Sequence, residues 1–257
     1  MQNHDISPNV LWHDLTAAVG LLTRLPIPVD TDRAMARGSG SAWAYPLVGL
    51  VVALCVLPIA SAALWIGLDA SIVAGICLLV SIVITGAMHE DGLADSADGL
   101  WGGWTVERRL EIMKDSRIGT YGVLALGLSL ILRYAAILGL IDAGALWSGL
   151  VIAAIGSRAV MLALMGSLEN ARKDGLSRSV GRPASATMMS GVMLGTVCIA
   201  IIGGWHVLTF VLIAAIAGLT CAAIAQRKIG GQTGDILGAS QQVSEIALLA
   251  TALVVLT

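Results

Sequence analysis

The sequence predicts an all-α fold, a polytopic integral membrane helix bundle with about seven transmembrane helices. Two observations carry this prediction. Of the 257 residues, 57% are hydrophobic and only 12% are charged, with a mean hydropathy of +0.86, whereas a typical soluble domain carries roughly 25% charged residues. The apolar residues also form runs too long for globular cores, and a helix of ~20 apolar residues crosses a hydrocarbon layer.

Seven apolar segments follow one another, and each is expected to be a helix because lipid offers the backbone no hydrogen-bond partners. They cover residues 43–68, 71–88, 119–141, 143–167, 188–203, 205–225 and 241–257. The stretch Val10–Leu25 is apolar but contains His13 and Asp14, so we expect an interfacial helix there. We predict a single membrane domain over residues 1–257, opened by a cytoplasmic or interfacial segment at 1–42.

Basic residues predict the orientation of the bundle. Thirteen of the fifteen Lys and Arg residues fall in four segments: 24–37, 108–117, 172–182 and 227–228. The alternate connections, near residues 69, 142 and 204, have none. Short loops rich in Lys and Arg stay in the cytoplasm. We therefore expect an external C-terminus and three cytoplasmic loops, at 89–118, 168–187 and 226–240.

Other features exclude some functions. The formal net charge of −2 gives no electrostatic footprint for nucleic acid. The four cysteines are scattered in apolar segments and are expected to be buried hydrophobic residues: Cys55, Cys77, Cys198 and Cys221. Three histidines show no ligand spacing and are expected to be structural: His4, His13 and His206.

An acidic stretch, His89–Gly99 (HEDGLADSADG), directly follows the uncharged run Ser71–Met88. Asp91, Asp95 and Asp98 stand at i, i+4 and i+7, which places them on one helix face. At the C-terminal end of a span the helix dipole disfavours anions, so a cation is expected to compensate. Carboxylate oxygens are typical Mg²⁺ ligands. The alternative is a solvated acidic helix end.

Two further polar stretches are expected on the same side of the membrane. Glu111–Gly122 (EIMKDSRIGTYG) supplies cations suited to phosphate, Lys114 and Arg117; a basic membrane anchor is the alternative. Gly230–Glu245 places Asp235 in a glycine-rich turn and Glu245 at the start of the last span, where the dipole would favour it. Acidic residues from two stretches on one face predict a phosphate–metal site between helices.

Arg133 and Arg158 lie near the middle of two predicted spans. A charge inside the membrane by default marks a polar cavity or an ion pair. We expect either such a cavity or an interhelical pair with an acid such as Glu245.

Together these stretches resemble the cobalamin synthase family, the adenosylcobinamide-GDP ribazoletransferases. The family's patterns are matched in order, by TRLPIP at Thr23–Pro28, HEDGLADSADG at His89–Gly99, EIMKDSRIGTYG at Glu111–Gly122, ARKDGL at Ala171–Leu176 and GQTGDILGA at Gly231–Ala239. Two departures are Glu90, where the family often has an apolar residue, and Glu169-Asn170, where a Pro-Tyr pair is common.

The resemblance implies a Mg²⁺-dependent enzyme of the bacterial cytoplasmic (inner) membrane, with its active site facing the cytoplasm. Its substrates would be adenosylcobinamide-GDP and α-ribazole or α-ribazole 5′-phosphate. The ribose 3′-hydroxyl would attack the cobinamide-side phosphorus and release GMP, which completes the nucleotide loop of cobalamin. A homo-oligomer is compatible with the sequence.

The resemblance also implies roles for the matching residues. The metal ligands would be Asp91, Asp95 and Asp98. Phosphate charge would be stabilised by Lys114 and Arg117, and the base would be His89 or Asp235, between which the sequence does not decide. Six further residues would bind substrate: Arg24, Asp115, Ser116, Arg172, Thr233 and Gly234.

Other function classes fit less well. Membrane prenyltransferases and CDP-alcohol phosphotransferases also use Asp-rich helix ends with Mg²⁺, but their acidic motifs differ from those of this sequence. A transporter could bind a coupling cation through carboxylates. Transporter sites usually lie near the bilayer midplane, whereas the acidic residues here crowd one predicted face.

Overall fold

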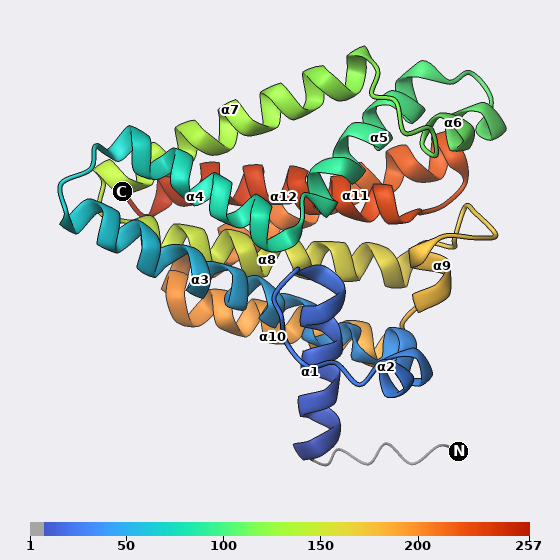
Figure 1. The fold of residues 1–257 in the computed structure, drawn as a ribbon, viewed down its shortest axis with the longest axis horizontal. Coiled ribbons are helices and arrows are strands. Elements are labelled where there is room, and N and C mark those ends of the chain that lie inside the picture. The colour runs from blue at the N-terminus through green and yellow to red at the C-terminus, as the bar shows by residue number, and fades with distance from the viewer. Residues whose placement is uncertain (1–7) are drawn as a thin grey trace.

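The computed structural model describes residues 8–257 and shows an all-α bundle of long, roughly parallel and antiparallel helices (Figure 1). Residues 1–7, which include His4 and the start of the predicted N-terminal segment, lie outside the described residues. The helices are α1 Pro8–Leu22, α2 Thr31–Arg37, α3 Tyr45–Trp65, α4 Ala70–Thr85, α5 Met88–Gly102, α6 Val106–Ile112, α7 Thr120–Asp142, α8 Leu146–Ser167, α9 Leu176–Val180, α10 Ser185–Gly203, α11 Val207–Ile229 and α12 Gly234–Val255. Two 3₁₀ segments, Gly38–Ala44 and Gly204–His206, precede α3 and α11.

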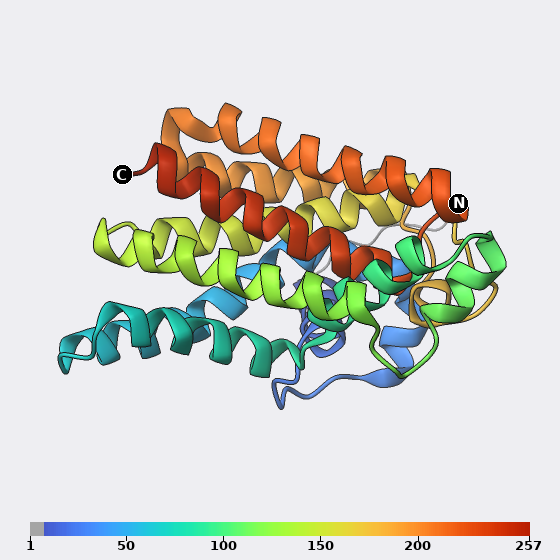
Figure 2. The same cartoon turned by 90° about the horizontal axis from the view of Figure 1, so that it is seen from above.

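The predicted membrane bundle is confirmed, with a different count of spans. Five helical segments of the described chain are long and apolar enough to cross a membrane, or up to six if the bent pair α4–α5 counts as one span. One of the five, residues 185–229, contains both α10 and α11. Gly204 breaks it with φ 56°, and the two helices contact each other and run side by side (Figure 2). The prediction of about seven counted α4, α10 and α11 separately.

Helix α8 lies at the centre of the bundle, and most of its residues are buried. It contacts α3, α10, α11 and α12 (Figure 1). Glycines allow this close packing, because a side chain at Gly49 of α3 would overlap the backbone at Ala154 of α8. Small residues at helix contacts are the usual solution in membranes, where dispersion forces replace the hydrophobic effect.

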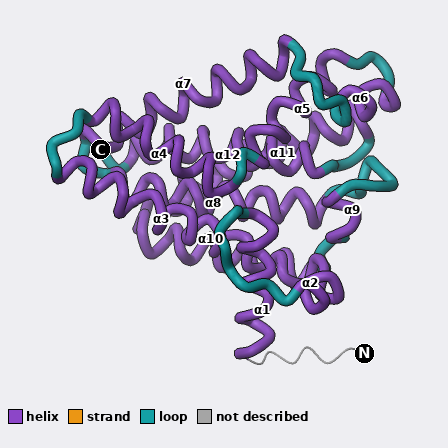
Figure 3. The backbone as a smooth tube through the Cα atoms, in the orientation of Figure 1, coloured by secondary structure: helices purple, strands orange, loops and turns teal. Residues whose placement is uncertain are grey.

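The connections between the long helices gather at the two ends of the bundle (Figure 3). One end holds the turns after α3, after α7 and after α10. The other end, which we call the loop end, holds the segments 103–119, 168–184 and 230–233. The basic loops of the sequence therefore share one end of the molecule, as their spacing predicts.

Helix α5 turns away from α4 by 88°. Gly86 and Ala87 both have positive φ at this bend, and Gly86 also leaves room for the side chain of Arg24. The acidic stretch was expected at the C-terminal end of a span, where the dipole opposes it. It lies instead on a separate helix, and Glu90 and Asp91 occupy the first turn, where the dipole favours anions.

Helix α1 confirms the predicted N-terminal helix and lies across the direction of the long helices (Figure 1). Its buried Asp14 accepts two hydrogen bonds from Arg37 at 2.7 and 2.8 Å and one from the indole of Trp43 at 2.8 Å. This buried carboxylate is fully engaged, and it ties α1 to the segment that enters α3.

Candidate active site

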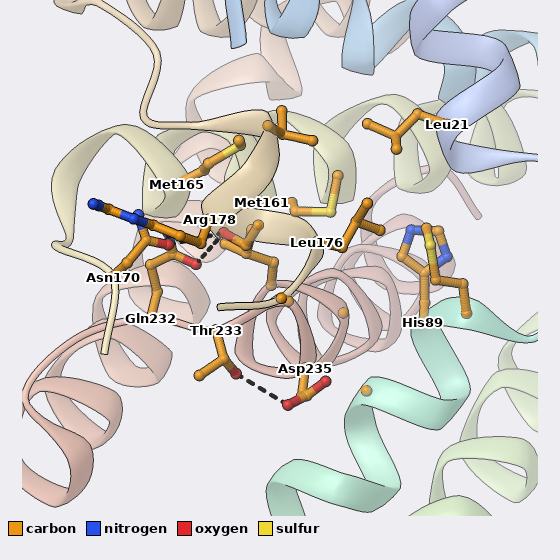
Figure 4. Close-up of a pocket in the computed structure, with 18 of the residues that line it drawn as sticks. Leu21, His89, Met161, Met165, Asn170, Leu176, Arg178, Gln232, Thr233 and Asp235 are labelled. Carbon is orange, nitrogen blue, oxygen red and sulfur yellow. Dashed lines mark hydrogen bonds between the residues drawn. The ribbon is translucent and has the colours of Figure 1, made fainter. Parts of the chain in front are cut away.

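A cavity of about 260 Å³ opens at the loop end, where α5, α8, α9 and α12 meet (Figure 4). Its lining combines apolar side chains with ionisable residues from three separate stretches of the sequence. The acidic, arginine and histidine residues of the lining are His89, Asp91, Arg172, Asp174, Arg178 and Asp235. Convergent polar groups in a concave, partly apolar cavity are typical of a ligand site.

Glycines bring the two acidic stretches together. A Cβ on Gly92 would lie 2.8 Å from the Asp235 carbonyl oxygen, and a Cβ on Gly238 would lie 3.3 Å from the His89 backbone. Helices α5 and α12 therefore approach backbone to backbone, which only glycine permits here. Asp91 and Asp235 consequently line the same cavity, although they are 144 positions apart in the sequence.

Asp235 was expected in a turn before the last span, but it lies in the first turn of α12. Thr233 caps this helix by accepting a hydrogen bond from the Ile236 amide at 3.3 Å. The Asp235 carboxylate is 2.9 Å from Nη1 of Arg172 and accepts a 3.2 Å hydrogen bond from the Thr233 hydroxyl. The structure thus joins three of the predicted site residues, and Gly234 lines the cavity beside them.

A network of neutral residues, missed by sequence reasoning, fixes the loop that carries Arg172. The Ala171 amide donates to the Gln232 carbonyl at 2.9 Å, and the Gln232 amide donates to Glu169 at 2.8 Å. The Gln232 side chain bonds Asn170 at 2.9 Å and Ser177 at 2.8 Å (Figure 4). Gln232 is fully buried, so these bonds replace the water that it loses.

His89 is 1% exposed and lines the cavity. Its Nε2 atom has no hydrogen-bond partner among the residues that the structure describes. A buried polar atom without a partner is uncommon and requires an explanation. Because this nitrogen belongs to a residue of the cavity wall, a bound ligand is one group that could complete it.

Asp98, a predicted metal ligand, is hydrogen-bonded to backbone amides at the start of α7. Its Oδ2 accepts a hydrogen bond from the Gly119 amide at 2.7 Å, and its Oδ1 accepts one from the Gly122 amide at 2.9 Å. These contacts cap the N-terminus of α7. Asp98 is 8% exposed and does not line the cavity. Within residues 8–257, Asp91, Asp95 and Asp98 do not form a preformed group of metal ligands.

The comparison with known proteins decides the family. The chain matches the family described as cobalamin-5-phosphate synthase over residues 14–253. The chain belongs to this family. Proteins named adenosylcobinamide-GDP ribazoletransferase are similar over nearly the full length: the Mesorhizobium japonicum protein is 39% identical (100% of this chain, 99% of that protein), and the Bradyrhizobium diazoefficiens protein is 41% identical (93% and 92%). No solved structure matches the chain.

The predicted phosphate residues of this synthase-family chain lie outside the cavity. Lys114 donates hydrogen bonds of 3.0 and 2.7 Å to Asp174, which hold the pKa of that carboxyl below its usual range. Arg117 is 88% exposed and bonds Asp115, whose pKa it lowers through these hydrogen bonds. Ser116 is exposed in the same loop. Among these four residues, Lys114 bonds a residue of the cavity, Asp174.

Arg24, the remaining predicted substrate residue, is exposed beside the bend between α4 and α5. Its amide donates to the Ile84 carbonyl at 2.6 Å, and its side chain lies over Gly86. Arg24 does not line the cavity. In the synthase-family fold of this chain, the residue therefore supports the start of α5 rather than the cavity wall.

Behind the cavity lies a second polar group, which we call the buried cluster: Glu90, Arg133, Arg158, Gln241, Gln242 and Glu245. Arg133 is 2.8 Å from Glu90 and 3.6 Å from Glu245, and Arg158 is 3.9 Å from Glu245. The expected interhelical pair with Glu245 is present, and Glu90 joins it. Glu245 lies in the middle of α12 rather than at its start. This family member thus carries paired charges inside the bundle.

Proposed function

We propose that the cavity is the active site of an adenosylcobinamide-GDP ribazoletransferase. The enzyme joins α-ribazole, or α-ribazole 5′-phosphate, to adenosylcobinamide-GDP and releases GMP. The products are adenosylcobalamin or its 5′-phosphate. One observation supports the assignment above the others: two of the family's sequence stretches place Asp91 and Asp235 in one cavity with Arg172.

The reaction exchanges a phosphoanhydride bond of the diphosphate for a phosphoester bond to the acceptor. The 3′-hydroxyl oxygen of the acceptor ribose forms a bond to the cobinamide-side phosphorus of the diphosphate. The bond between this phosphorus and the bridging oxygen breaks, and the bridging oxygen leaves with GMP. The hydroxyl proton must pass to a base. Phosphoryl transfer of this kind depends mainly on positioning and on charge stabilisation.

The carboxylates at the cavity fit a Mg²⁺ ion by their chemistry. Asp91 is exposed, stands four positions before Asp95 on the same helix, and lines the cavity with Asp235. Mg²⁺ is usually held by one or two carboxylates with water and substrate phosphate, so it does not require a group of three protein ligands. Asp91 and Asp235 would hold the ion, with Asp95 beside them. When bound, Mg²⁺ would neutralise charge on the diphosphate.

The arginines of the cavity are our candidates for binding phosphate, in preference to Lys114 and Arg117. Arg172 has its guanidinium 2.9 Å from Asp235, and Arg178 also lines the cavity. A guanidinium can hold two phosphate oxygens at once through its planar fork. The pair with Asp235 aims Arg172 toward the carboxylates that would hold the ion. Arg172 would therefore bind the transferred phosphate, and Arg178 the departing GMP.

His89 is the residue that we assign to the hydroxyl proton. His89 lines the cavity, and its buried Nε2 has no partner among residues 8–257. Asp235, the rival from the sequence, is already engaged by Arg172 and by Thr233. A general base must lie within hydrogen-bond reach of the proton that it accepts, and an unengaged nitrogen meets that need more readily than a paired carboxylate.

The loop end would face the cytoplasm of a bacterial cell, and the C-terminus would be external. The support is the gathering of basic loops at this end, because such loops resist translocation. Cysteine labelling of intact cells tests the orientation. A cysteine at position 101 should resist an impermeant reagent, and one at position 144 should react; the reverse pattern would contradict the orientation.

Turnover by the purified chain tests the function. Protein in lipid nanodiscs is incubated with adenosylcobinamide-GDP, α-ribazole and Mg²⁺, and GMP and adenosylcobalamin are measured. We expect equimolar GMP and adenosylcobalamin, and neither product when α-ribazole is omitted. GMP without adenosylcobalamin would indicate hydrolysis, and no release of GMP by folded protein would contradict the proposal.

A further inference from the structure

One side of the cavity is apolar, although its other side is charged. Met161 and Met165 of α8 line it and are only 3% and 2% exposed. Leu21 of α1 and Leu176 of α9 line the same cavity. Figure 4 shows Leu21, Met161 and Leu176 on one side and Asp235 on the other. The cavity therefore suits a ligand with one apolar end and one anionic end.

The size of the cavity limits what can enter it. Its volume is about 260 Å³, slightly below the range of roughly 300–1,000 Å³ that is usual for sites of drug-sized ligands. The corrin ring of the donor is far too large for this volume, so a nucleoside base and the diphosphate are the parts of the substrates that can enter. The apolar side must therefore hold either the base of the acceptor or the guanine of the donor.

The chemistry of the two bases separates these alternatives. The base of α-ribazole is dimethylbenzimidazole, a flat ring with two methyl groups and no amino or carbonyl group. Guanine carries both, and its polar edge would lack partners against Leu and Met side chains, which is costly. Methionine sulfur also makes favourable contacts with aromatic rings, and its flexible chain fits flat ligands.

We propose that the apolar side of the cavity binds the base of the acceptor nucleoside, and that Met161 makes the enzyme prefer an apolar base. The proposal rests on the proposed function. The ring of the acceptor lies between Met161 and Leu176, and its ribose lies toward His89, which accepts the proton of the 3′-hydroxyl. The diphosphate of the donor lies on the opposite side, at Arg172 and the carboxylates.

The test replaces Met161 by a residue of similar shape that is polar. For Met161→Gln we expect the KM for α-ribazole to rise about tenfold, since one mismatched contact in an apolar pocket discriminates by roughly 10- to 200-fold. The KM for adenosylcobinamide-GDP should stay the same. The preference for α-ribazole over the α-riboside of adenine should fall by a similar factor. Met161→Leu, which keeps the side apolar, should shift these values less.

Controls make each outcome decisive. Met189→Gln makes the same exchange at an exposed position of α10, and its kinetics should match the wild type. Leu176→Gln, at a residue that is 54% exposed, repeats the test if Met161→Gln does not fold. A rise in the KM for adenosylcobinamide-GDP instead would place guanine on this side and overturn the proposal, as would no change in either KM. An inactive wild type would contradict the proposed function itself.

Discussion

Two neighbouring residues of α5 serve two regions that satisfy their charges in opposite ways. Glu90 belongs to the buried cluster, where it is 8% exposed and lies 2.8 Å from Arg133, itself 1% exposed. Asp91, the next residue, lines the open cavity and is exposed. The buried cluster pairs its carboxylates with arginines of α7 and α8, whereas the cavity leaves Asp91 without a salt bridge within the described residues.

The difference follows from solvation. Inside the bundle an unpaired charge is costly, so each carboxylate of the buried cluster needs a cation or a hydrogen-bond donor. At the loop end, water can solvate a carboxylate until a ligand arrives. Paired charges therefore hold the helices in place, and the accessible charge remains free for chemistry. This comparison predicts that substitutions in the buried cluster reduce folding, and that substitutions in the cavity reduce turnover.

The largest effect is expected for Arg133→Met. The change leaves Glu90 buried without its principal cation, and removing one partner of a buried pair costs about 3–5 kcal/mol. We expect little monodisperse protein by detergent size-exclusion chromatography and a strongly lowered unfolding temperature.

The double variant Glu90→Leu, Arg133→Met is the matched control. Replacing both partners of a buried pair by apolar residues is often neutral, so the double variant should recover much of the folded yield. A stable Arg133→Met protein that has lost turnover would place Arg133 in the reaction rather than in the fold, and would contradict the comparison.

The next largest effect is expected for Asp91→Asn. Loss of a carboxylate that would hold Mg²⁺ on the diphosphate should lower kcat by roughly 100- to 1,000-fold, as loss of one group that stabilises transition-state charge commonly does. The unfolding temperature should change little. Release of GMP is measured over a Mg²⁺ titration. Glu107→Gln removes another exposed acid at the same end and should keep wild-type rates; near-wild-type rates for Asp91→Asn at limiting Mg²⁺ would exclude the metal role.

Much of the fold could be predicted from the sequence, because lipid forces long apolar segments into helices. The breaks were harder to predict. The sequence places no proline between α4 and α5, and the bend depends on positive φ at Gly86 and Ala87. The start of α12 was placed too late because Gly234 and Gly238 suggest a loop, although in the structure Gly238 serves the contact with α5.

The candidate site was predicted in part. Periodicity placed the aspartates of α5 together, but spacing cannot reveal that Asp98 caps α7 through backbone amides 21 and 24 positions away. Cation chemistry and the family resemblance predicted phosphate binding by Lys114 and Arg117, which stays a prediction, whereas the cavity is lined by Arg172 and Arg178. The bond between the Asn170 and Gln232 side chains spans 62 positions, and neutral amides carry no periodic signal that marks them in advance.

A smaller effect is expected for Asp98→Asn. This variant tests whether Asp98 stabilises the fold or takes part in the reaction. An amide can accept only through its one oxygen, so one of the two amides that Asp98 caps loses its acceptor. Loss of a helix cap typically costs about 0.5–2 kcal/mol. We expect a lowered unfolding temperature and near-normal kcat per folded molecule. A variant of normal stability that lacks turnover would instead support the predicted role of Asp98 as a metal ligand.

The smallest effects are expected for Lys114→Arg and Arg117→Lys. If these residues clamped phosphate, Arg117→Lys would lose much activity, because an ammonium cannot replace the planar fork of a guanidinium. Both residues lie outside the cavity in exposed salt bridges, which contribute little to stability.

Because Lys114 lowers the pKa of Asp174, the bridge between them is present at neutral pH and is lost only as the pH falls through the lowered pKa. At neutral pH we therefore expect kcat/KM near the wild-type value for both exchanges, and a clear loss in Arg172→Lys measured beside them. A large loss in Arg117→Lys alone would mean that the loop closes over the cavity when substrate binds.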